Sequence, residues 1–563
     1  WNGVNSQTNS VLYESGGNIG IGTTVPTSFL TIAGATTTKA SLNLISSTTP
    51  PNVPVDGDVY YDTAKDSLMI YTGSKWQADR SSTTLIVAAN DSLNKEKADY
   101  VADGTGDQVE IEAAITALPA GGGAVVLLDG TYSISADITI DKSNVRLIGQ
   151  GRATLLSRAF NDTTPRNSGV ITISDNSTTR SNIAISHLRI EGNKGTHASD
   201  DNHGIFVRRA IETKIDNVYI ENSGGDGVNF YNSGAVAASG TVIINSFISG
   251  SGANGIWVDT INLTNGRILN NQLSTNTLYG IFLDSGTGYV NIIGNVLKSN
   301  TQRGISILGG GYNLISANTF QSSGEVSLRL RQTDNNTVTG NIITTSVGAG
   351  IYLYTALDNV VSGNNISAGS AEGIYLDASS NRNSITGNIL DTNATSGIRV
   401  YNDSDDNQIA ENRLYNNTAG SASSSIYIDY ASDNTVVKNN YIRDTAGSGY
   451  AIRIGNSITA STGTILGGNN YGGTGAATIS DSGTATIYEG QLAGASANDL
   501  VFTPGGNFGI GSESPTSKLD VFGTTWLRGG TGNTTGLYVN SSGNIGIGTT
   551  LTNGYALNVN GIT

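Results

Sequence analysis

The chain has 563 residues, of which 37% are hydrophobic, 13% are charged and 73 are glycine, a composition that suits turns and stacked strands better than helices. Cysteine is absent, so neither disulfides nor thiolate metal sites hold the protein together. The net charge of -15 disfavours nucleic acid and anionic membranes as partners, because both attract clustered Lys and Arg, and no run of about 18 apolar residues is present to insert into a membrane.

The first predicted element is a short glycine-rich module in residues 1–50. It contains the phrase GNIGIGTT at 17–24 and an alternating Leu-Thr-Ile run at 30–32. Similar phrases return at 506–511 and 543–550, within a C-terminal module predicted for residues 486–563. Each phrase has too few aliphatic side chains to bury a core alone, so other copies of the chain are expected to complete it.

These GIGTT-type phrases resemble repeats of trimeric bacteriophage tail fibres and bacterial surface adhesins. The resemblance implies an extracellular fibre, on a virion surface or a cell-surface appendage, built as a homotrimer. Because similar modules stand at both ends, a head-to-tail homopolymer is the alternative. A phosphate-binding role for the glycines is disfavoured, because no helix start follows them.

Residues 51–90 predict a small strand pair. Aromatic and aliphatic residues alternate at 57–62 and 68–76, with a turn around Asp66. The pattern resembles a motif common in phage fibres and other extracellular proteins. We therefore expect a structural β-hairpin collar.

The longest predicted domain covers residues 91–485 and opens with a helical cap at about 98–120. Asp107 is expected to cap a helix in which Ile111, Ala114, Ile115 and Leu118 share one face. A lone amphipathic helix before a series of strands is typical of a plug over the open end of a solenoid.

The remainder of this domain repeats about every 24 residues, which predicts a solenoid. Each repeat combines Ile/Val-x-x-Asn-x-aliphatic with a later Gly-Ile-x-aliphatic strand. The Asn members are expected to form a buried structural ladder, in which each amide donates to one coil and accepts from the next. The Gly before each Ile, such as Gly255 or Gly373, is expected to require a positive φ. The Asn members are Asn271, Asn295, Asn318, Asn341, Asn364, Asn388, Asn412 and Asn440.

The phrases DGTGD at 103–107 and GGAVVLLDGTY at 122–132 resemble the entry to right-handed parallel β-helices of the pectate-lyase-like superfamily. The resemblance extends over about 98–480. It implies an all-β protein, a right-handed parallel β-helix with one short capping helix, flanked by short trimeric β-modules. At about 4.8 Å per coil, ~14 coils would form a rod of roughly 65 Å. That fold hosts lyases, hydrolases, epimerases, tailspikes and inert spacers, so it leaves the activity open.

Outward positions of the Gly-Ile strands carry the candidate ligand-binding residues. Aromatic faces beside carboxylates are typical of a carbohydrate groove. The same columns also suit a subunit interface or plain packing between strands. The aromatic column is Phe206, Trp257, Phe282, Tyr352, Tyr375 and Tyr427, and the acidic column is Asp259, Asp284, Asp377 and Asp429.

Two pairs of side chains are candidates for catalysis. Asp259 and Asp284 fall on adjacent coils, with the carboxylate spacing of a retaining glycosidase, but any stacked pair acquires that spacing from the ladder. The same pair could instead hold Ca²⁺, and no other cofactor or metal is predicted. His203 and Asp226 precede glycines on consecutive coils and form either an acid–base pair or an incidental loop contact.

Three functional hypotheses follow. The first is a structural or adhesive extracellular fibre with a rigid β-helix shaft that binds a surface glycan. The second is a polysaccharide-degrading tailspike, a lyase or glycoside hydrolase, that uses the outward Asp and aromatic face. The third is a subunit of a head-to-tail extracellular filament.

Overall fold

The computed structural model describes residues 12–21, 24–25, 30–32, 46–47, 49–63, 67–71, 76–78, 83–162, 168–174, 177–231, 238–259, 263–284, 286–417, 424–444, 449–455, 459–473, 479–489, 500–502, 508–510, 519–521, 525–527, 537–539, 544–547 and 557–559. The chain divides into two compact units, Trp1–Thr84 and Leu85–Thr563. Each unit is considered by itself.

The first unit contains two small sheets. Antiparallel pairing joins β1 (Leu12–Ser15) to β2 (Asn18–Ile21), and β2 runs parallel to β3 (Leu30–Ile32). The second sheet consists of β4 (Ser46–Ser47), β5 (Val59–Asp62), β6 (Ser67–Tyr71) and β7 (Trp76–Ala78). Within it β5 and β6 are the antiparallel pair expected in residues 51–90, whereas the expected turn at Asp66 lies outside the described residues.

Two sheets of the C-terminal region repeat this pattern. In both sheets an antiparallel strand pair is followed by a parallel strand, as in β1 to β3. Thr23 of the first GIGTT phrase and both threonines of the last phrase, at 549–550, lie outside the described residues. The strands are β53 (Leu500–Phe502), β54 (Phe508–Ile510), β55 (Leu519–Val521), β56 (Thr525–Leu527), β57 (Leu537–Val539), β58 (Ile545–Ile547) and β59 (Leu557–Val559).

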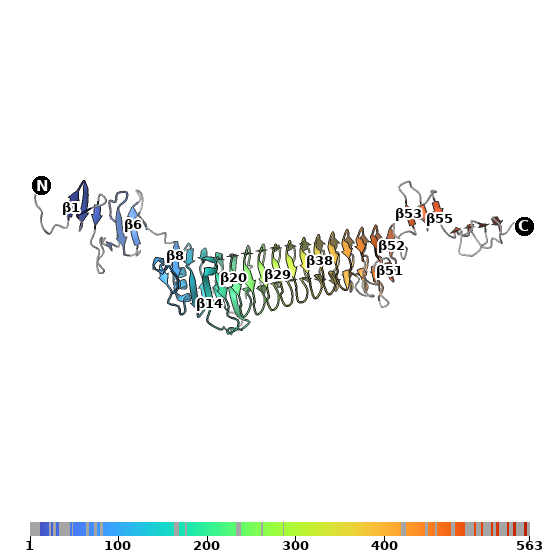
Figure 1. Ribbon diagram of the computed structural model, residues 1–563, viewed down its shortest axis with the longest axis horizontal. Coiled ribbons are helices and arrows are strands. Elements are labelled where there is room, and N and C mark those ends of the chain that lie inside the picture. The colour runs from blue at the N-terminus through green and yellow to red at the C-terminus, as the bar shows by residue number, and fades with distance from the viewer. Residues whose placement is uncertain are drawn as a thin grey trace. The chain divides into compact units, whose positions relative to one another are not determined.

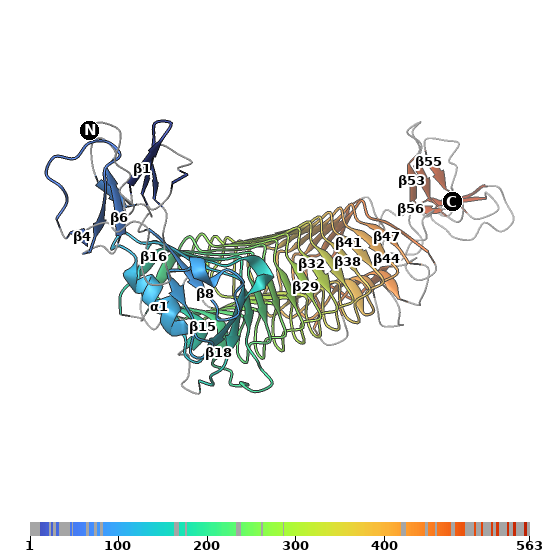
Figure 2. The same ribbon diagram turned by 60° about the vertical axis from the view of Figure 1, so that its left-hand side comes forward.

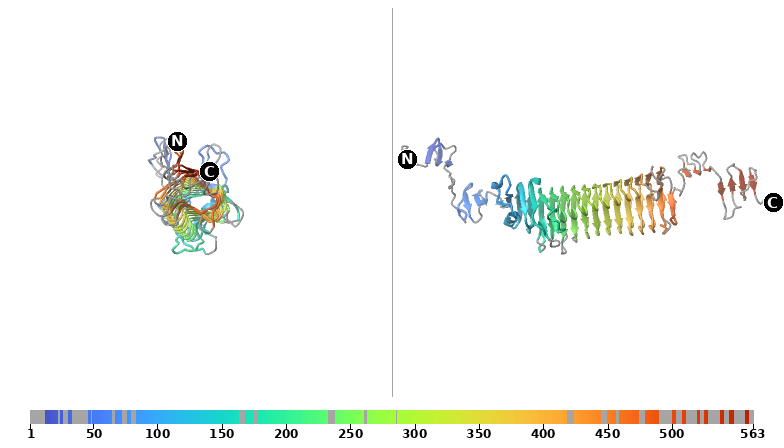
Figure 3. Two further views of the ribbon diagram at one scale, coloured as in Figure 1. Left: turned by 90° about the vertical axis from the view of Figure 1, so that its right-hand side faces the viewer. Right: turned by 60° about the horizontal axis from the view of Figure 1, so that its bottom comes forward.

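Three long sheets of parallel strands form a right-handed β-helix in the second unit (Figures 1 and 2). Two of these sheets, called sheets 2 and 3 below, have 14 strands each, so the helix has about 14 turns. Each turn contributes one strand to each sheet, and the view along the axis shows the coils stacked around a common centre (Figure 3). The predicted fold class is therefore confirmed for this region.

Sheet 1 contains β8 (Thr84–Ala88), β9 (Tyr100–Val101), β10 (Gly123–Leu127), β13 (Val145–Ile148), β16 (Arg180–Ser186), β19 (Ala210–Asp216), β22 (Val242–Ile244), β25 (Arg267–Leu269), β28 (Asn291–Ile293), β31 (Leu314–Ser316), β34 (Thr337–Thr339), β37 (Val360–Ser362), β40 (Ser384–Thr386), β43 (Gln408–Ala410), β46 (Val436–Lys438), β49 (Ile465–Gly467) and β52 (Ile487–Glu489). Sheet 2 contains β11 (Gly130–Ile134), β14 (Thr154–Arg158), β17 (Arg189–Glu191), β20 (Tyr219–Glu221), β23 (Phe247–Ser249), β26 (Gln272–Ser274), β29 (Val296–Lys298), β32 (Thr319–Gln321), β35 (Ile342–Thr344), β38 (Asn365–Ser367), β41 (Ile389–Asp391), β44 (Arg413–Tyr415), β47 (Tyr441–Arg443) and β50 (Asn470–Gly472). Sheet 3 contains β12 (Ile138–Ile140), β15 (Ser168–Ile173), β18 (Asn202–Val207), β21 (Val228–Tyr231), β24 (Ile256–Asp259), β27 (Ile281–Leu283), β30 (Ile305–Leu308), β33 (Leu328–Arg331), β36 (Ile351–Tyr354), β39 (Ile374–Asp377), β42 (Ser396–Val400), β45 (Ser424–Ile428), β48 (Tyr450–Ile454) and β51 (Ile479–Asp481).

One α-helix, α1 (Gln108–Ala117), is present among the described residues, besides the short 3₁₀ turns η1 (Lys95–Lys97) and η2 (Gly151–Ala153). It contacts β10, β11 and β12 of the first coil, and its Ile111 and Ile115 join the core. Asp107 precedes α1 but does not cap it. Its carboxylate instead accepts hydrogen bonds from the backbone N–H groups of Gly104 and Ser133, both at 2.7 Å, and so fixes the helix to the first coil.

The core consists of aliphatic side chains stacked along the axis. Alternating strand positions point inward, so that aliphatic residues of adjacent coils stack on one another. Ile281 is in register with Ile305, and Ile351 is in register with Ile374. This continuous apolar column is the main source of stability in a chain without disulfides.

The Asn ladder lies in the turn between sheets 1 and 2, and its members are buried. The backbone N–H and the Nδ2 of Asn364 both donate to Oδ1 of Asn388, at 3.0 and 2.9 Å, and Nδ2 also donates to the carbonyl oxygen of Val338. The same pattern continues beyond Asn440 to Asn469. Both polar ends of each buried amide are therefore satisfied by neighbouring coils.

The expectation that the strand-leading glycines have a positive φ is wrong. In the turn between sheets 1 and 2, the residue before the ladder Asn is left-handed instead, as at Asn270 with φ of 54°. Glycine is required before the strand because of crowding between coils. A Cβ on Gly255 would lie 2.6 Å from the carbonyl oxygen of Gly280, and one on Gly373 would lie 2.7 Å from that of Gly397.

None of the helices among the described residues is long and apolar enough to cross a bilayer.

Candidate functional site

The outward side chains of sheet 3, with the residue that directly follows each strand, are called here the sheet 3 face. They include the predicted aromatic and acidic columns, with Asp284 and Asp429 directly after β27 and β45. Their strands are in register, so the middle outward residues form one column along the axis. The predicted aromatic residues share this column with polar and basic residues that sequence reasoning missed. From β18 to β48 the column reads Phe206, Asn229, Trp257, Phe282, Ser306, Arg329, Tyr352, Tyr375, Arg399, Tyr427 and Arg453.

The first coils of this face are not open to solvent. Phe206 is 0% exposed, because its ring lies between those of His203 and Tyr231, at centroid distances of 5.2 and 6.4 Å. Asp259 is 1% exposed. Both were expected on an accessible outward surface, and neither can contact a polymer in this structure.

His203 and Asp226 lie in contact, as their positions before consecutive glycines predicted. The backbone N–H of Asp226 donates to Nδ1 of His203 at 3.0 Å, and the carboxylate oxygen Oδ2 of Asp226 lies 3.3 Å from the same nitrogen. The carboxylate of Asp226 accepts from Asn229 Nδ2 at 2.7 Å and from the backbone and side-chain nitrogens of Asn254. Because both residues are at least 98% buried, the geometry is that of a structural polar cluster.

Asp259 and Asp284 lie one coil apart, since the N–H of Asp284 donates to the carbonyl oxygen of Val258 at 2.9 Å. Only Asp284 is partly exposed. A glycosidase requires both carboxyl groups at the scissile bond, so the burial of Asp259 disfavours this pair as its catalytic acids. In the described part of the chain, no three His, Cys, Asp or Glu side chains are grouped closely enough to hold a metal ion.

Partly exposed aromatic rings on the sheet 3 face form two stacks. Trp257 and Phe282 are nearly parallel, with ring centroids 6.1 Å apart, and Tyr352 and Tyr375 are 5.0 Å apart. Tyr352 donates its hydroxyl to Asp377 at 2.8 Å; burial and then this bond raise the pKa of Tyr352. Since rings within a stack cover one another, a sugar can reach only their edges and the outer faces of each stack.

Arg399 connects several predicted residues of the C-terminal half. Its guanidinium lies 5.5 Å from the ring centroid of Tyr375 and 5.3 Å from that of Tyr427. It also lies 3.3 Å from the carboxylate of Glu372 and 3.7 Å from that of Asp429. Burial, with a hydrogen bond to Asp429, raises the pKa of Tyr427 to about 12. Aromatic, basic and acidic groups thus hold one another in place here.

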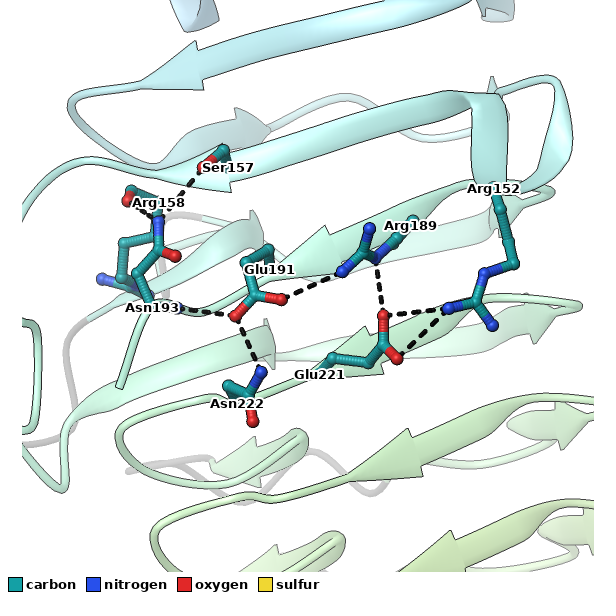
Figure 4. Close-up of polar contacts among 8 residues, drawn as sticks. All are labelled: Arg152, Ser157, Arg158, Arg189, Glu191, Asn193, Glu221 and Asn222. Atoms are coloured by element: carbon teal, nitrogen blue, oxygen red, sulfur yellow. Dashed lines mark hydrogen bonds and ion pairs between the residues drawn. The ribbon is translucent and has the colours of Figure 1, made fainter. Parts of the chain in front are cut away.

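A second polar cluster, absent from the sequence predictions, lies on sheet 2 (Figure 4). Glu191 and Glu221 are in register on adjacent strands, and Arg189 bridges them at 3.2 and 2.6 Å. Arg152 reaches Glu221 at 3.3 Å, while Asn222 donates to Glu191 at 3.0 Å. The two carboxylates are balanced by two guanidinium groups, so the cluster is a neutral ion-pair network.

A hollow of about 280 Å³ lies beside this network. Its only basic residue, Lys194, donates to the carbonyl oxygen of Gly250 at 2.6 Å. The lining residues are therefore largely occupied by contacts within the protein. They are Glu191, Asn193, Lys194, Gly195, Thr196 and Asn222.

Comparisons with known proteins agree with this architecture. Residues 168–310 and 254–414 match the family model "Right handed beta helix region". Comparison with curated protein sequences gives no significant match.

Several solved structures are similar in fold. The pre-mature bacteriophage phi29 gene product 12 has 17% identity and a TM-score of 0.56, over 70% of this chain and 56% of that protein. The A-module of mannuronan C-5 epimerase AlgE4 from Azotobacter vinelandii has 17% identity and a TM-score of 0.41, over 70% and 96%. Tailspike protein 3 of bacteriophage CBA120 has 13% identity and a TM-score of 0.43, over 79% and 66%. At these identities the likeness concerns the fold alone.

Proposed function

We propose that the protein is an extracellular fibre protein, a phage tail fibre or a cell-surface filament, whose β-helix is a rigid shaft that contacts glycans through the sheet 3 face. The observation that carries the proposal is the state of the acidic residues. The carboxylates best placed for catalysis, Asp226 and Asp259, are buried, and Glu191 and Glu221 are ion-paired. The partly exposed residues of the sheet 3 face are mainly aromatic and basic, with Asp284 and Asp377 as partly exposed carboxylates, and this composition suits binding better than bond cleavage.

The fibre is proposed to be a homotrimer that associates through sheet 1. The β1–β2 module exposes Leu12 and Tyr13, at 57% and 44%, so a single chain does not complete it. Sheet 1 has no charged outward residue from β28 to β43, whereas a chain of net charge -15 repels its own copies elsewhere. Those outward residues are Asn291, Ile293, Leu314, Ser316, Thr337, Thr339, Val360, Ser362, Ser384, Thr386, Gln408 and Ala410.

The proposal is tested by measuring binding and cleavage together. The chain is incubated with a panel of bacterial surface polysaccharides, and retention on immobilised glycan is compared with the release of reducing ends. We expect retention without release, and a native mass equal to three chains. Release of reducing ends that survives Asp284→Asn would locate an enzyme elsewhere on the surface, and release that this variant abolishes would favour a degrading tailspike.

A further inference from the structure

Three arginines gather on two consecutive coils of the sheet 3 face. Arg329 and Arg331 are the two outward residues of β33, and Arg303 lies two residues before β30 on the preceding coil. Leu328 and Leu330 of the same strand point into the core, so the backbone fixes both guanidinium stems outward. We call Arg303, Arg329 and Arg331 the arginine cluster.

The cluster has a surplus of positive charge. Arg303 forms an ion pair with Glu325 at 2.7 Å and donates to the hydroxyl of Tyr279 at 2.6 Å. Arg329 donates only to the neutral hydroxyl of Ser306, at 3.2 Å. Neither Arg329 nor Arg331 has a carboxylate within ion-pair distance among the described residues. Three cations and one anion therefore leave a surplus of about two charges.

The surroundings increase the cost of that surplus. Burial, together with the neighbouring charges of Arg303 and Arg331, lowers the pKa of Arg329. Like charges held close together in a partly desolvated place repel strongly, and a bound anion relieves both the repulsion and the unmet hydrogen-bonding capacity. Elsewhere on this face the corresponding cation, Arg399, already has Glu372 and Asp429 beside it. The arginine cluster, unlike Arg399, is thus a place on sheet 3 where a bound anion would balance unpaired positive charge.

The two aromatic stacks end on either side of the cluster. Phe282 lies one coil before Ser306, and Tyr352 lies one coil after Arg329 in the same column. Ser306 is small and fully buried, so it adds no bulk between the end of the first stack and the guanidinium groups. Arg331 lies beside the ring of Tyr354, 5.6 Å from its centroid. The column therefore has aromatic rings on both sides of the arginine cluster, an arrangement that suits a polymer of ring-shaped anionic units.

We propose that the arginine cluster binds the anionic groups of an acidic polysaccharide, with the flanking rings contacting adjacent sugars. This inference rests on the proposed glycan-binding function of the sheet 3 face and specifies its ligand class. Guanidinium groups recognise carboxylate and sulfate through paired hydrogen bonds, so both groups satisfy the chemistry of the site. Nucleic acid is a poor alternative because three arginines on a chain of net charge -15 cannot track a phosphate backbone.

The test uses three probes of graded charge: polygalacturonate for carboxylate, dextran sulfate for sulfate, and dextran as the neutral control. Binding of the full chain is compared with that of the Arg329→Gln/Arg331→Gln variant. Gln keeps a polar outward side chain and removes repulsion, so the variant is expected to unfold at the same temperature or higher. The matched control is Arg413→Gln, an exposed outward arginine of sheet 2.

We expect the full chain to bind at least one anionic probe in preference to dextran, and the double variant to bind it about tenfold or more weakly, as the loss of two charge-assisted contacts predicts. The Arg413→Gln control should bind like the parent, and added salt should weaken binding. Which anionic probe binds distinguishes carboxylate from sulfate recognition.

Undiminished binding of the anionic probe by the double variant would overturn the inference, and so would a preference of the parent for dextran. In the second case glycan binding itself would stand, and only the ligand class would be wrong. Failure to retain these probes or any member of the polysaccharide panel would contradict the proposed function as well.

Discussion

Sheets 1 and 3 of the β-helix have the same interior and opposite exteriors. Both direct Ile, Leu and Val side chains to a shared core. Outside, sheet 1 is uncharged from β28 to β43, whereas sheet 3 carries arginines, carboxylates and stacked rings over the same coils. The core residues set the coil geometry, and every outward position is then free to differ. One repeat can therefore carry both the proposed assembly surface and the proposed ligand surface.

The largest expected effect comes from making sheet 1 resemble sheet 3 in charge. Thr337→Glu with Val360→Glu places carboxylates on adjacent strands of the neutral face of an acidic chain. Like charges brought together at an interface are strongly repulsive, so we expect the proposed trimer to dissociate to monomers in native mass measurements.

The control for this change is Gln321→Glu, which adds a carboxylate to an exposed outward position of sheet 2. It should leave the trimer intact. A double variant that stays trimeric would show that sheet 1 is not the contact face.

The interior shared by both faces is probed by Asn364→Leu. The substitution leaves the buried N–H of Asn341 and the carbonyl oxygen of Val338 without the partners that Asn364 provides. We expect a loss of about 3 kcal/mol in the free energy of unfolding, measured by urea denaturation, because buried polar groups become unsatisfied.

Asn365→Leu, at the exposed neighbouring position, should change this value by only about 0.5 kcal/mol. Equal losses in the two variants would contradict a specific role for the ladder.

The folding stability that Tyr427 of the sheet 3 face provides should fall at alkaline pH. The pKa of Tyr427 is raised from 10.0 to about 12 in the folded state, so above pH 10 the unfolded chain loses this proton first. Stability from this group is complete below pH 10 and declines as the pH rises toward 12. Tyr427→Phe should therefore lose less stability over this interval than the parent, measured by chemical denaturation at each pH. Identical declines would mean that Tyr427 does not contribute.

The smallest effect is expected at the turn between the two sheets. Arg382 and Asp358 form a bidentate ion pair at 2.8 Å, but both side chains are largely exposed. Arg382→Gln should lower the midpoint of urea unfolding only slightly at low salt and leave it unchanged at high salt, because exposed pairs are screened. A loss of stability as large as that of Asn364→Leu would show that this pair supports the coil.

The repeat predicts the fold because inward positions must be alike in every coil. Buried Ile281 and Ile305 stack in register, and that requirement is written into the Gly-Ile-x-aliphatic phrase. The prediction of a positive φ for Gly255 is wrong for a related reason. Its constraint is a clash with the next coil, which the spacing of residues within one coil does not reveal.

Outward residues follow no such requirement, so the sequence supports fewer conclusions about the candidate site. Arg329 and Arg399 occupy the same outward position of the repeat as Tyr352, but a prediction based on aromatic residues does not include them. The burial of Asp259 and Phe206 depends on neighbouring side chains and loops, and no periodicity encodes that cover.

The position of α1 has a consequence for how the solenoid is made. The helix covers the first coil, which is the first part of the β-helix to leave the ribosome. Each later coil pairs in parallel register with the one before it, so a growing chain presents a single edge on which the next coil can form. Biosynthesis can thus proceed in one direction, with the oldest end already closed against stray pairing partners.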